Sequence, residues 1–463
     1  MAGKTNQTRE AWSGKWMFIL AAAGSAVGLG NMWRFPYLAA KYGGGTFLFV
    51  YLILVFTLGV SLLLQDITLG RASRKSSIGA FGHFGKGKGW NIVGVLASAV
   101  PFLILPYYCI IGGWVTKYAT GYITAGTDAL ADGGNFFVSF ITSNFESYIW
   151  LIIFAAIVLG IVAMGVKGGI EKINLVLMPA LIVLALGVAL FTLTIPGAME
   201  GVAYYLTPDV SKISPELLLA AIGQCFFSMS IAMCIMVTYG SYVEEKENLV
   251  SSTNRIAGFD LGFSVLAGFM IIPGAVAALG SAEAVSSSSG PSLMFITLPT
   301  VFEHMGAAAP IVGTIFFLLA LFAAITSAIS IAEACVSIVS DAMGTTRLKS
   351  TAIVAAWALL VGIFVNAGYN VLSGIEPLGE GSSLLDLFDF LSNSVLMPVV
   401  ALGTCLFVGW VIKPKALIDE VEKFGNKFGL QGPWSVMIKY IAPILIVVVL
   451  IAYVGAQFGL ISM

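Results

Sequence analysis

The sequence predicts an all-helical integral membrane protein, a single domain over residues 1–463 with about eleven transmembrane helices. Of its 463 residues, 58% are hydrophobic and only 10% are charged, whereas soluble proteins carry roughly 25% charged residues. The apolar runs are long enough to cross a lipid bilayer as helices and too long for the alternating strands of a membrane barrel. The net charge of −1 gives no reason to expect a nucleic-acid partner.

Eleven apolar runs are predicted to span the membrane, because a helical span needs about 20 residues. They lie at residues 16–40, 45–70, 90–122, 148–166, 171–195, 217–242, 255–280, 308–341, 350–367, 384–412 and 434–459. A shorter apolar stretch at 293–302 lies in the serine-rich loop 281–307. We expect a loop helix there, and its apolar content argues against a disordered loop.

Positive charge is concentrated in alternate loops. Lys and Arg gather in segments such as 71–75 and 413–427, whereas 123–147, 281–307 and 368–383 contain neither. Positively charged residues favour cytoplasmic loops. The pattern predicts a multi-pass protein of the cell membrane whose N-terminus is cytoplasmic, and an odd number of spans then puts the C-terminus outside.

The first run contains an interruption, "GSAVGLGNMWRFP" (24–36). Three of its residues are glycines, which weaken a helix by about 1 kcal/mol each relative to alanine. It also contains Asn31 and Arg34, and an arginine inside a membrane span is costly unless it has a function. An irregular backbone at membrane depth is tolerated where it lines a cavity.

The sixth run, "AAIGQCFFSMSIAMCIMVTYGSYVEE" (220–245), is interrupted in a similar way by Gln224, Ser228 and Ser230. The two interruptions predict two repeats, at about 16–195 and 217–412, followed by an extra helix at 434–459. Interrupted segments at matching positions of two halves are typical of a transporter binding site.

Three motifs resemble the neurotransmitter:sodium symporter family. "GSAVGLGNMWRFPYLAAKYGGGTFLFVY" (24–51) is similar to its first-helix signature, "GQCFFSMS" (223–230) to its sixth-helix core, and "AAITSAISI" (323–331) to its eighth-helix sodium motif. The resemblance runs from about residue 9 to the end. It implies a LeuT-type fold, two inverted repeats of five helices with discontinuous helices 1 and 6. It also implies a sodium-coupled amino-acid symporter that works by alternating access and is not an enzyme.

The resemblance further implies two sodium ions. Sodium is a hard cation that prefers oxygen ligands, and unwound carbonyls and hydroxyls supply them. The ligands of the first site would be Ala26, Asn31, Ser228 and Asp260, completed by the substrate carboxylate. Those of the second would be Gly24, Val27, Ala323, Thr326 and Ser327. The alternative for the hydroxyls is a bond to their own or a neighbouring helix.

The implied substrate is a neutral hydrophobic or aromatic amino acid. Monoamine carriers of the family have an aspartate where this chain has Gly24, so the substrate should bring its own carboxylate. The N–H groups of Leu29 and Gly30, at a half-helix N-terminus that favours anions, and the hydroxyl of Tyr108 would bind it. Tyr108 could instead serve only for packing. The implied substrate-binding residues are Ser25, Ala26, Leu29, Gly30, Ile104, Tyr108, Phe227, Ser228, Ser230, Met233, Ser327 and Ile331.

Asp260 departs from the family pattern, in which an asparagine is usual at this position. The residues that match a chloride site in animal members are Tyr51, Gln224, Ser228 and Ser264. Asp260 precedes Ser264 by four residues and so shares its helix face. A carboxylate there would supply the negative charge that chloride otherwise brings, which predicts chloride-independent transport. The alternative is that Asp260 is paired elsewhere.

Two pairs of charged residues match the family's gates. Arg34 and Asp389 would close the outer side, with Tyr108 and Phe227 as a lid over the substrate. The inner gate would be formed by Arg9 and Asp341, with Trp12 and Tyr242 beside them. Gly169 and Pro179 weaken the start of the fifth run, which is consistent either with local unwinding or with an ordinary helix start.

Other classes of function remain as alternatives at this point. Channels usually assemble a repeated filter from several subunits, which two unlike broken helices in one chain do not suggest. A membrane enzyme would need a nucleophile or metal motif such as HExxH, and the sequence has none. A transport-inactive amino-acid sensor and a carrier for a glycine- or GABA-like molecule stay open. The sequence does not decide whether the chain forms a homo-oligomer.

Overall fold

The computed structural model describes residues 9–85, 89–124, 133–286 and 290–460. Every regular element in these ranges is helical, and they contain no strand, which confirms the all-helical prediction. Nine continuous helical segments in the described ranges are long and apolar enough to cross a membrane. They are Gly45–Ser73, Asn91–Thr124, Glu146–Ala163, Val166–Leu193, Leu249–Leu279, Gly306–Met343, Arg347–Tyr369, Leu384–Val411 and Gln431–Gln457.

These segments coincide with nine of the eleven predicted runs, and several of them combine α-helix with turns of wider π-helix. The main elements are α3 (Gly45–Leu54), η2 (Val55–Gly59), α4 (Val60–Ser73), α6 (Asn91–Thr124), α8 (Glu146–Ala163), η3 (Val166–Ile170), α9 (Glu171–Leu193), α13 (Leu249–Leu279), α16 (Ala309–Met343), α17 (Arg347–Asn366), α18 (Leu384–Asp389), η8 (Phe390–Leu396), α19 (Met397–Leu406), η9 (Phe407–Val411), α21 (Gln431–Val436), η11 (Met437–Ile441) and α22 (Ala442–Gln457).

The first run is broken between α1 (Lys15–Ala26) and the segment Gly30–Lys41, which is formed by η1 (Gly30–Arg34) and α2 (Phe35–Lys41). The two halves are bent by 52°. Val27, which ends α1, has an extended backbone (φ −77°, ψ 93°). The break therefore lies within the glycine-rich interruption that the sequence predicted.

The glycines of this break are needed for close approach. Neither Gly24 nor Gly28 has a left-handed φ. A Cβ atom at Gly24 would lie 2.2 Å from Oδ1 of Asn174, and one at Gly28 would lie 2.6 Å from Oγ of Ser327. Both distances are far shorter than a normal contact, so any larger residue would have to displace α9 or α16 side chains.

The sixth run is broken between α11 (Pro215–Ser228) and α12 (Ile235–Ser241). Here three non-glycine residues have left-handed backbones, Ser230 (φ 53°), Ala232 (φ 61°) and Cys234 (φ 65°). This conformation costs an L-residue roughly 1–2 kcal/mol and persists only where the surroundings impose it. One such restraint is the N–H of Ala232, which donates to the buried Asp66 at 3.1 Å.

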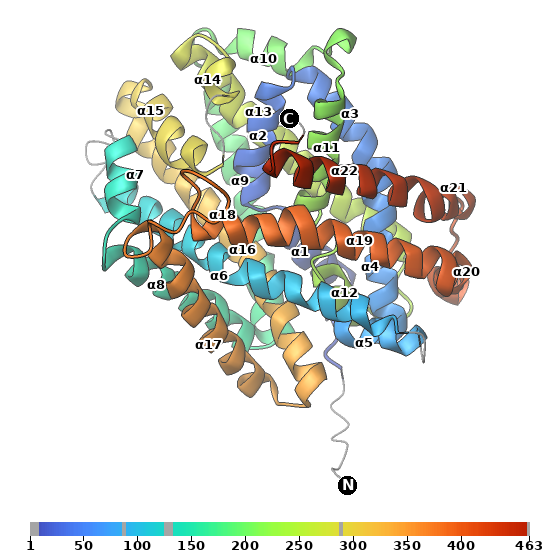
Figure 1. Ribbon diagram of the computed structural model, residues 1–463. Coiled ribbons are helices and arrows are strands. Elements are labelled where there is room, and N and C mark those ends of the chain that lie inside the picture. Colours follow the sequence, from blue (N-terminus) through green and yellow to red (C-terminus); the bar gives the residue numbers. More distant parts are fainter. Residues whose placement is uncertain (1–8, 86–88, 125–132, 287–289, 461–463) are drawn as a thin grey trace.

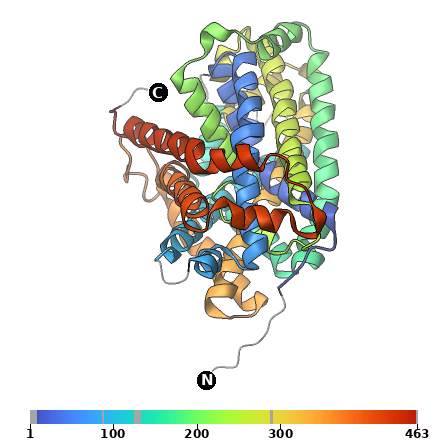
Figure 2. The same cartoon turned by 90° about the vertical axis from the view of Figure 1, so that its right-hand side faces the viewer.

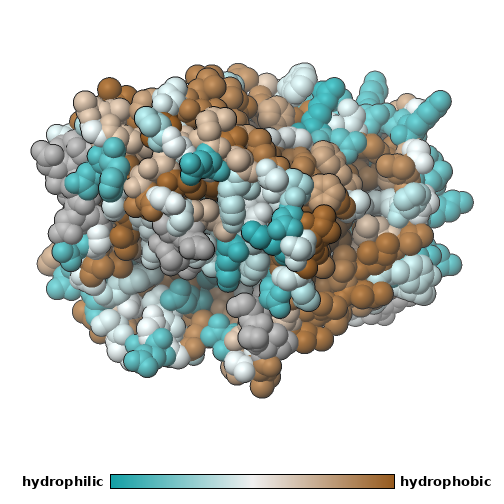
Figure 3. All heavy atoms as spheres, turned by 90° about the horizontal axis from the view of Figure 1, so that it is seen from above, coloured by the Kyte–Doolittle hydropathy of each residue, from teal (hydrophilic) through white to brown (hydrophobic). Residues whose placement is uncertain are grey.

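The short helices of alternate loops gather at opposite ends of the bundle (Figure 1). One end has α7 (Gly133–Ile141), α10 (Ala198–Leu206), α14 (Glu283–Ser286) and α15 (Leu298–Glu303), and the other has α5 (Ser77–Phe84), α20 (Pro414–Val421) and the first described residues. α15, with η5 (Leu293–Thr297) before it, is the loop helix expected at 293–302. Seen from above, hydrophilic and hydrophobic residues are mixed over the surface (Figure 3).

The two breaks lie inside the bundle. α1 packs against α9, α12, α13 and α16, and α16 also packs along α6. The C-terminal segment α19–α22 lies across one face of the molecule (Figure 2), where α22 contacts α19 and α11. The start of the fifth run is wound here, because η3 continues directly into α9, with Pro179 inside the helix.

Candidate substrate and ion site

A small cavity of about 30 Å³ lies between the two helix breaks. We call it the central cavity. It is lined by Ser25, Ala26, Gly28, Leu29, Gly30, Asn31, Ile104, Tyr108, Phe227, Ser228, Ser230, Met233, Ile235, Ser327 and Ile331. All twelve residues predicted to bind substrate are in this set. Sequence reasoning missed Gly28 and Ile235, and the signal for Ile235 was its place in the first turn after the second break.

The first break and its neighbours leave little free volume around the cavity. A Cβ at Gly30 would lie 2.3 Å from the ring of Phe227, and one at Gly28 would lie 3.4 Å from the hydroxyl of Tyr108. Tyr108 comes from α6, and its hydroxyl approaches the residues that precede the N-terminus of η1. A carboxylate in the cavity would meet this hydroxyl and the N–H groups of Leu29 and Gly30 at the start of η1. The next N–H group, that of Asn31, already donates to the Gly28 carbonyl at 3.1 Å.

The opposite wall of the cavity is mostly apolar. Ile104, Met233 and Ile331 are all at most 5% exposed. The polar exception is a pair of serines, since the Oγ atoms of Ser25 and Ser230 lie 3.2 Å apart. Such a wall suits an apolar side chain, and the flexible methionine can adapt to its shape.

Beside the cavity, four polar residues from three helices form one hydrogen-bonded group. Nδ2 of Asn31 lies 2.7 Å from Oδ1 of Asp260, 2.8 Å from Oγ of Ser264 and 3.0 Å from Oγ of Ser228. Ser228 also donates to Asp260. Three of the four predicted ligands of the first sodium are therefore in contact, and the fourth, Ala26, lines the adjacent cavity.

Asp260 is fully buried and forms no ion pair with any residue in the described ranges. Its hydrogen bonds come from neutral groups, Asn31, Ser228 and the Tyr51 hydroxyl at 3.4 Å. A buried ionised carboxylate is costly unless a cation or a proton balances its charge. This group is therefore suited to hold a small cation.

Three of the four residues of the predicted chloride-like site, Tyr51, Ser228 and Ser264, lie around the same carboxylate. Tyr51 and Ser228 donate to Asp260 directly, while Ser264 is joined to it through Asn31. Gln224 is one contact further away, with Nε2 at 3.4 Å from the Gly30 carbonyl. The charge of Asp260 thus lies within the set of residues that would otherwise surround an anion.

The predicted second sodium site is formed between α1 and α16. Oγ of Ser327 lies 3.4 Å from the Gly24 carbonyl and 3.5 Å from that of Val27. The hydroxyl of Thr326 donates to the carbonyl of Ala323 on its own helix at 3.1 Å. All five predicted residues come together here, although Thr326 also makes the intrahelical bond that the alternative interpretation expected.

The predicted inner gate is closed. Arg9 pairs with Asp341 at 2.7 Å and donates to Ser241 and Ser337. Trp12 donates through Nε1 to the Tyr239 carbonyl at 3.0 Å, and its backbone N–H donates to the Tyr242 carbonyl. All four predicted residues, Arg9, Trp12, Tyr242 and Asp341, thus lie in one packed region.

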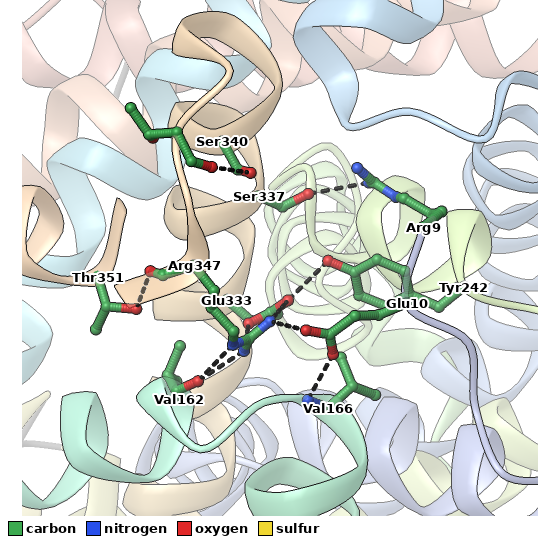
Figure 4. Close-up of polar contacts among 11 residues, drawn as sticks. Arg9, Glu10, Val162, Val166, Tyr242, Glu333, Ser337, Ser340, Arg347 and Thr351 are labelled. Carbon is green, nitrogen blue, oxygen red and sulfur yellow. Dashed lines mark hydrogen bonds and ion pairs between the residues drawn. The ribbon is translucent and has the colours of Figure 1, made fainter. Parts of the chain in front are cut away.

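Sequence reasoning missed three further residues of this region, Glu10, Glu333 and Arg347 (Figure 4). Glu333 is fully buried, accepts from Tyr242 at 2.7 Å, and pairs with Arg347 at 2.5 Å. Arg347 also pairs with Glu10 at 2.9 Å, and Glu10 accepts from the N–H of Val166 at the start of η3. A carboxylate inside a membrane span, as Glu333 is, was the signal that could have found this cluster.

The other end of the molecule is open. A vestibule of about 570 Å³ is lined by Arg34, Asp389, Tyr108 and Phe227, among other residues. Arg34 and Asp389 form no ion pair, although both are in the described ranges. The guanidinium of Arg34 instead lies 5.4 Å from the centre of the Phe227 ring. Tyr108 and Phe227 line both the vestibule and the central cavity, so they separate the two.

Residues 9–129 and 141–458 match the model of the Sodium:neurotransmitter symporter family. The chain belongs to this family. Family membership makes it a multi-pass, sodium-dependent membrane transporter, and it sets aside the alternatives of a membrane enzyme and a channel.

Two bacterial transporters are similar to the chain over almost their whole length. An uncharacterized sodium-dependent transporter of Haemophilus influenzae is 34% identical, with 96% of this chain and 98% of the relative covered. One from Bacillus subtilis is also 34% identical, with 96% and 97% covered. A sodium- and chloride-dependent taurine transporter of Rattus norvegicus is 27% identical, covering 93% of this chain and 75% of its own.

A solved structure has the same fold. The crystal structure of MhsT in complex with L-phenylalanine superposes with a TM-score of 0.85 at 37% identity, covering 95% of this chain and 99% of MhsT. This agrees with the predicted LeuT-type fold of inverted repeats, in which the first and sixth helices are discontinuous.

Proposed function

We propose that the chain is a sodium-coupled symporter that imports a neutral hydrophobic or aromatic amino acid by alternating access. The observation that carries this proposal is Asp260, a fully buried carboxylate that has only neutral hydrogen-bond partners beside the central cavity. Its charge requires a cation, and a transporter that loads sodium there couples the ion to whatever fills the cavity. Sodium is here a transported substrate.

Support for an amino-acid substrate comes from the two walls of the central cavity. The Tyr108 hydroxyl and the N-terminus of η1 favour a carboxylate, which at the same time would complete the first sodium site. The apolar wall of Ile104, Met233 and Ile331 favours an apolar side chain. In the structure of MhsT the bound molecule is L-phenylalanine, which is consistent with this substrate class.

The test is a panel of radiolabelled amino acids taken up by proteoliposomes with and without a sodium gradient. We expect concentrative uptake of one or more hydrophobic or aromatic amino acids only when sodium is higher outside. If no amino acid shows sodium-dependent uptake or counterflow, the proposal is overturned. Sodium binding and amino-acid binding with neither uptake nor counterflow would favour the alternative of a transport-inactive sensor.

We further propose that two sodium ions are bound and that chloride is not required. The second ion is supported by the convergence of Gly24, Val27 and Ser327, and chloride independence by the position of Asp260 among Tyr51, Ser228 and Ser264. A sodium titration of uptake with a Hill coefficient near one would contradict two coupled ions. Replacement of chloride by gluconate should leave uptake unchanged, and a large loss would contradict the role given to Asp260.

The direction of transport depends on the orientation of the chain in the membrane. We propose that the protein lies in the cell membrane, with the N-terminus in the cytoplasm and the C-terminus outside. The closed pair of Arg9 and Asp341 would then face the cytoplasm, and the vestibule, at the end with α7, α10 and α15, would face outward. Reporter fusions at the two termini of the protein in whole cells test this. A C-terminal reporter that is active only in the cytoplasm would contradict the proposed arrangement.

A further inference from the structure

One buried side chain next to the second ion site has no assigned role. Asn174 is fully buried in α9. Its Nδ2 donates to the carbonyl of Ile170, the last residue of η3, at 2.9 Å. Its Oδ1 has no hydrogen-bond partner within the described ranges. Buried polar atoms are nearly always satisfied, so an unpartnered one calls for an explanation such as an ion or water.

The unpartnered oxygen is directed at the second ion site. A Cβ atom built on Gly24 would lie 2.2 Å from Oδ1 of Asn174, and the same Cβ would lie 3.3 Å from Cβ of Thr326. Gly24 and Thr326 are both residues of that site. The Nδ2 bond to Ile170 holds the amide plane, so the oxygen faces Gly24 and the nitrogen faces its own helix.

We propose that Oδ1 of Asn174 is a further ligand of the sodium ion in the second site. This inference rests on the proposed function, because it adds a residue from a third helix to the site formed by α1 and α16. An amide oxygen is a hard, neutral ligand that sodium accepts. Thr326 shares its hydroxyl hydrogen with its own helix, so a further oxygen would strengthen a set that otherwise consists mainly of carbonyls.

The position also explains why residue 24 is a glycine. The space that a side chain would fill is occupied by the Asn174 amide, and both groups lie against α16. In this arrangement α9 contributes directly to sodium binding. The side chain of Asn174 connects the ion site to the carbonyl of Ile170, at the end of η3.

The inference is tested on the purified full-length chain by sodium-dependent thermal stabilisation, with choline chloride keeping ionic strength constant. In Asn174→Leu and Asn174→Ala we expect the sodium concentration for half-maximal stabilisation to rise about tenfold or more, as is typical when a group that supports a metal site is removed. Asn174→Asp, which keeps an oxygen, should bind sodium at least as tightly as the wild type.

The matched control is Thr192→Val on the same helix. Thr192 is fully buried and its hydroxyl bonds the carbonyls of Val188 and Met270, remote from the ion site. Its sodium titration should equal that of the wild type. If Asn174→Leu does not fold, Asn174→Ala and Asn174→Ser give the same comparison with smaller side chains.

Two outcomes separate this inference from the proposed function. If the wild type is stabilised by sodium and folded Asn174 variants titrate at the same concentration, Oδ1 is satisfied by water only, and the inference is wrong while the symporter proposal stands. If the wild type shows no sodium response in stability or uptake, the proposed function itself is contradicted.

Discussion

The guanidinium of Arg9 lies 2.7 Å from the carboxylate of Asp341, across the end of the bundle that contains the N-terminus. The corresponding pair at the other end, Arg34 and Asp389, is not formed. The structure is therefore closed at the end that contains Arg9 and has a vestibule at the other end, as one of the two states of the proposed alternating access would require. Mutation of Arg9 or Asp341 should therefore shift the equilibrium between the two states.

Removal of Arg9 should favour the inward-open state. Arg9→Ala leaves Asp341 without its cation, and a loss of about 1.4 kcal/mol from the closed state would change the ratio of states about tenfold. The measurement is the rate at which a thiol reagent labels a cysteine introduced at Thr238, a buried position on α12. Arg255→Ala, at an exposed arginine beside Trp16, is the control and should label at the wild-type rate.

An unchanged labelling rate in Arg9→Ala would show that the pair does not hold the inner side closed. The five native cysteines are buried as Thr238 is, so each rate is compared with that of the same variant without the added cysteine.

Replacement of Asp260 should make transport depend on chloride. Asp260→Asn removes the buried charge but keeps the shape and the hydrogen bonds to Asn31 and Ser228. Uptake should then fall at least several-fold when chloride is exchanged for gluconate and recover when chloride is restored. Chloride-insensitive uptake by a folded Asp260→Asn variant would contradict the role of this carboxylate.

Asp209→Asn is the matched control for the loss of one negative charge. Asp209 is exposed in the segment before α11, and hydrogen bonds from the side chain and N–H of Ser211 lower the pKa of its carboxyl. It is therefore ionised at any assay pH near neutrality. Its removal should leave both uptake and chloride response unchanged.

Enlargement of Gly24 should be tolerated only when Asn174 is reduced. Gly24→Ala places a methyl group 2.2 Å from Oδ1 of Asn174, and overpacking of this kind costs about 1–3 kcal/mol of folding free energy. The double variant with Asn174→Ala should recover most of the lost thermal stability. Gly258→Ala, at a helical glycine with nothing within 4 Å of the added Cβ, should not be destabilised.

If the double variant is no more stable than Gly24→Ala alone, the contact with Asn174 is not what restricts the size of the side chain at position 24.

Replacement of Arg347 alone should lower the stability of the protein more than replacement of Arg347 together with its partner, the buried Glu333. Arg347→Ala leaves the fully buried Glu333 with an uncompensated charge, which typically costs about 3–5 kcal/mol. The double variant with Glu333→Gln removes that charge and should unfold at a higher temperature than Arg347→Ala. Equal melting temperatures would show that the pair contributes through packing and not through charge.

Loss of the Tyr108 hydroxyl should weaken substrate binding. A hydrogen bond to a charged group contributes about 1.5–3 kcal/mol, so Tyr108→Phe should raise the half-saturating amino-acid concentration at least tenfold with a smaller effect on maximal uptake. Tyr118→Phe on the same helix removes a hydroxyl that bonds the Phe295 carbonyl and should not change it. An unaltered half-saturation in Tyr108→Phe would leave this residue a packing role only.

Sequence patterns were sufficient for the features that interrupt an otherwise apolar chain. Glycine and polar residues at 24–36 and 224–230 located both helix breaks. Residues at or next to the breaks form most of the lining of the central cavity, to which α6 and α16 add Ile104, Tyr108, Ser327 and Ile331. The position of Asp260 beside Asn31 was implied by the family resemblance, and it agrees with the rule that a carboxylate within a membrane span faces a polar partner.

Contacts between distant helices were beyond the sequence. Nothing local in the chain indicates that Glu10, Glu333 and Arg347 meet, since each could have found another partner at the membrane surface. Asn174 resembles an ordinary polar residue near a helix start until its oxygen is seen against Gly24. The sequence indicated that the glycines of the first break weaken the helix. It did not indicate that they are also needed because no larger side chain fits there.

The two breaks should therefore differ in their genetics. In the first, glycines are required because side chains of Asn174, Ser327 and Phe227 occupy the adjacent space, so second-site suppressors of a harmful substitution should arise on other helices. In the second, the constraint lies in the backbone torsions of Ser230, Ala232 and Cys234. Suppressors there should restore the backbone conformation, either at the altered residue or at a contact that holds it, such as Asp66, so the two breaks should draw their suppressors from different parts of the molecule.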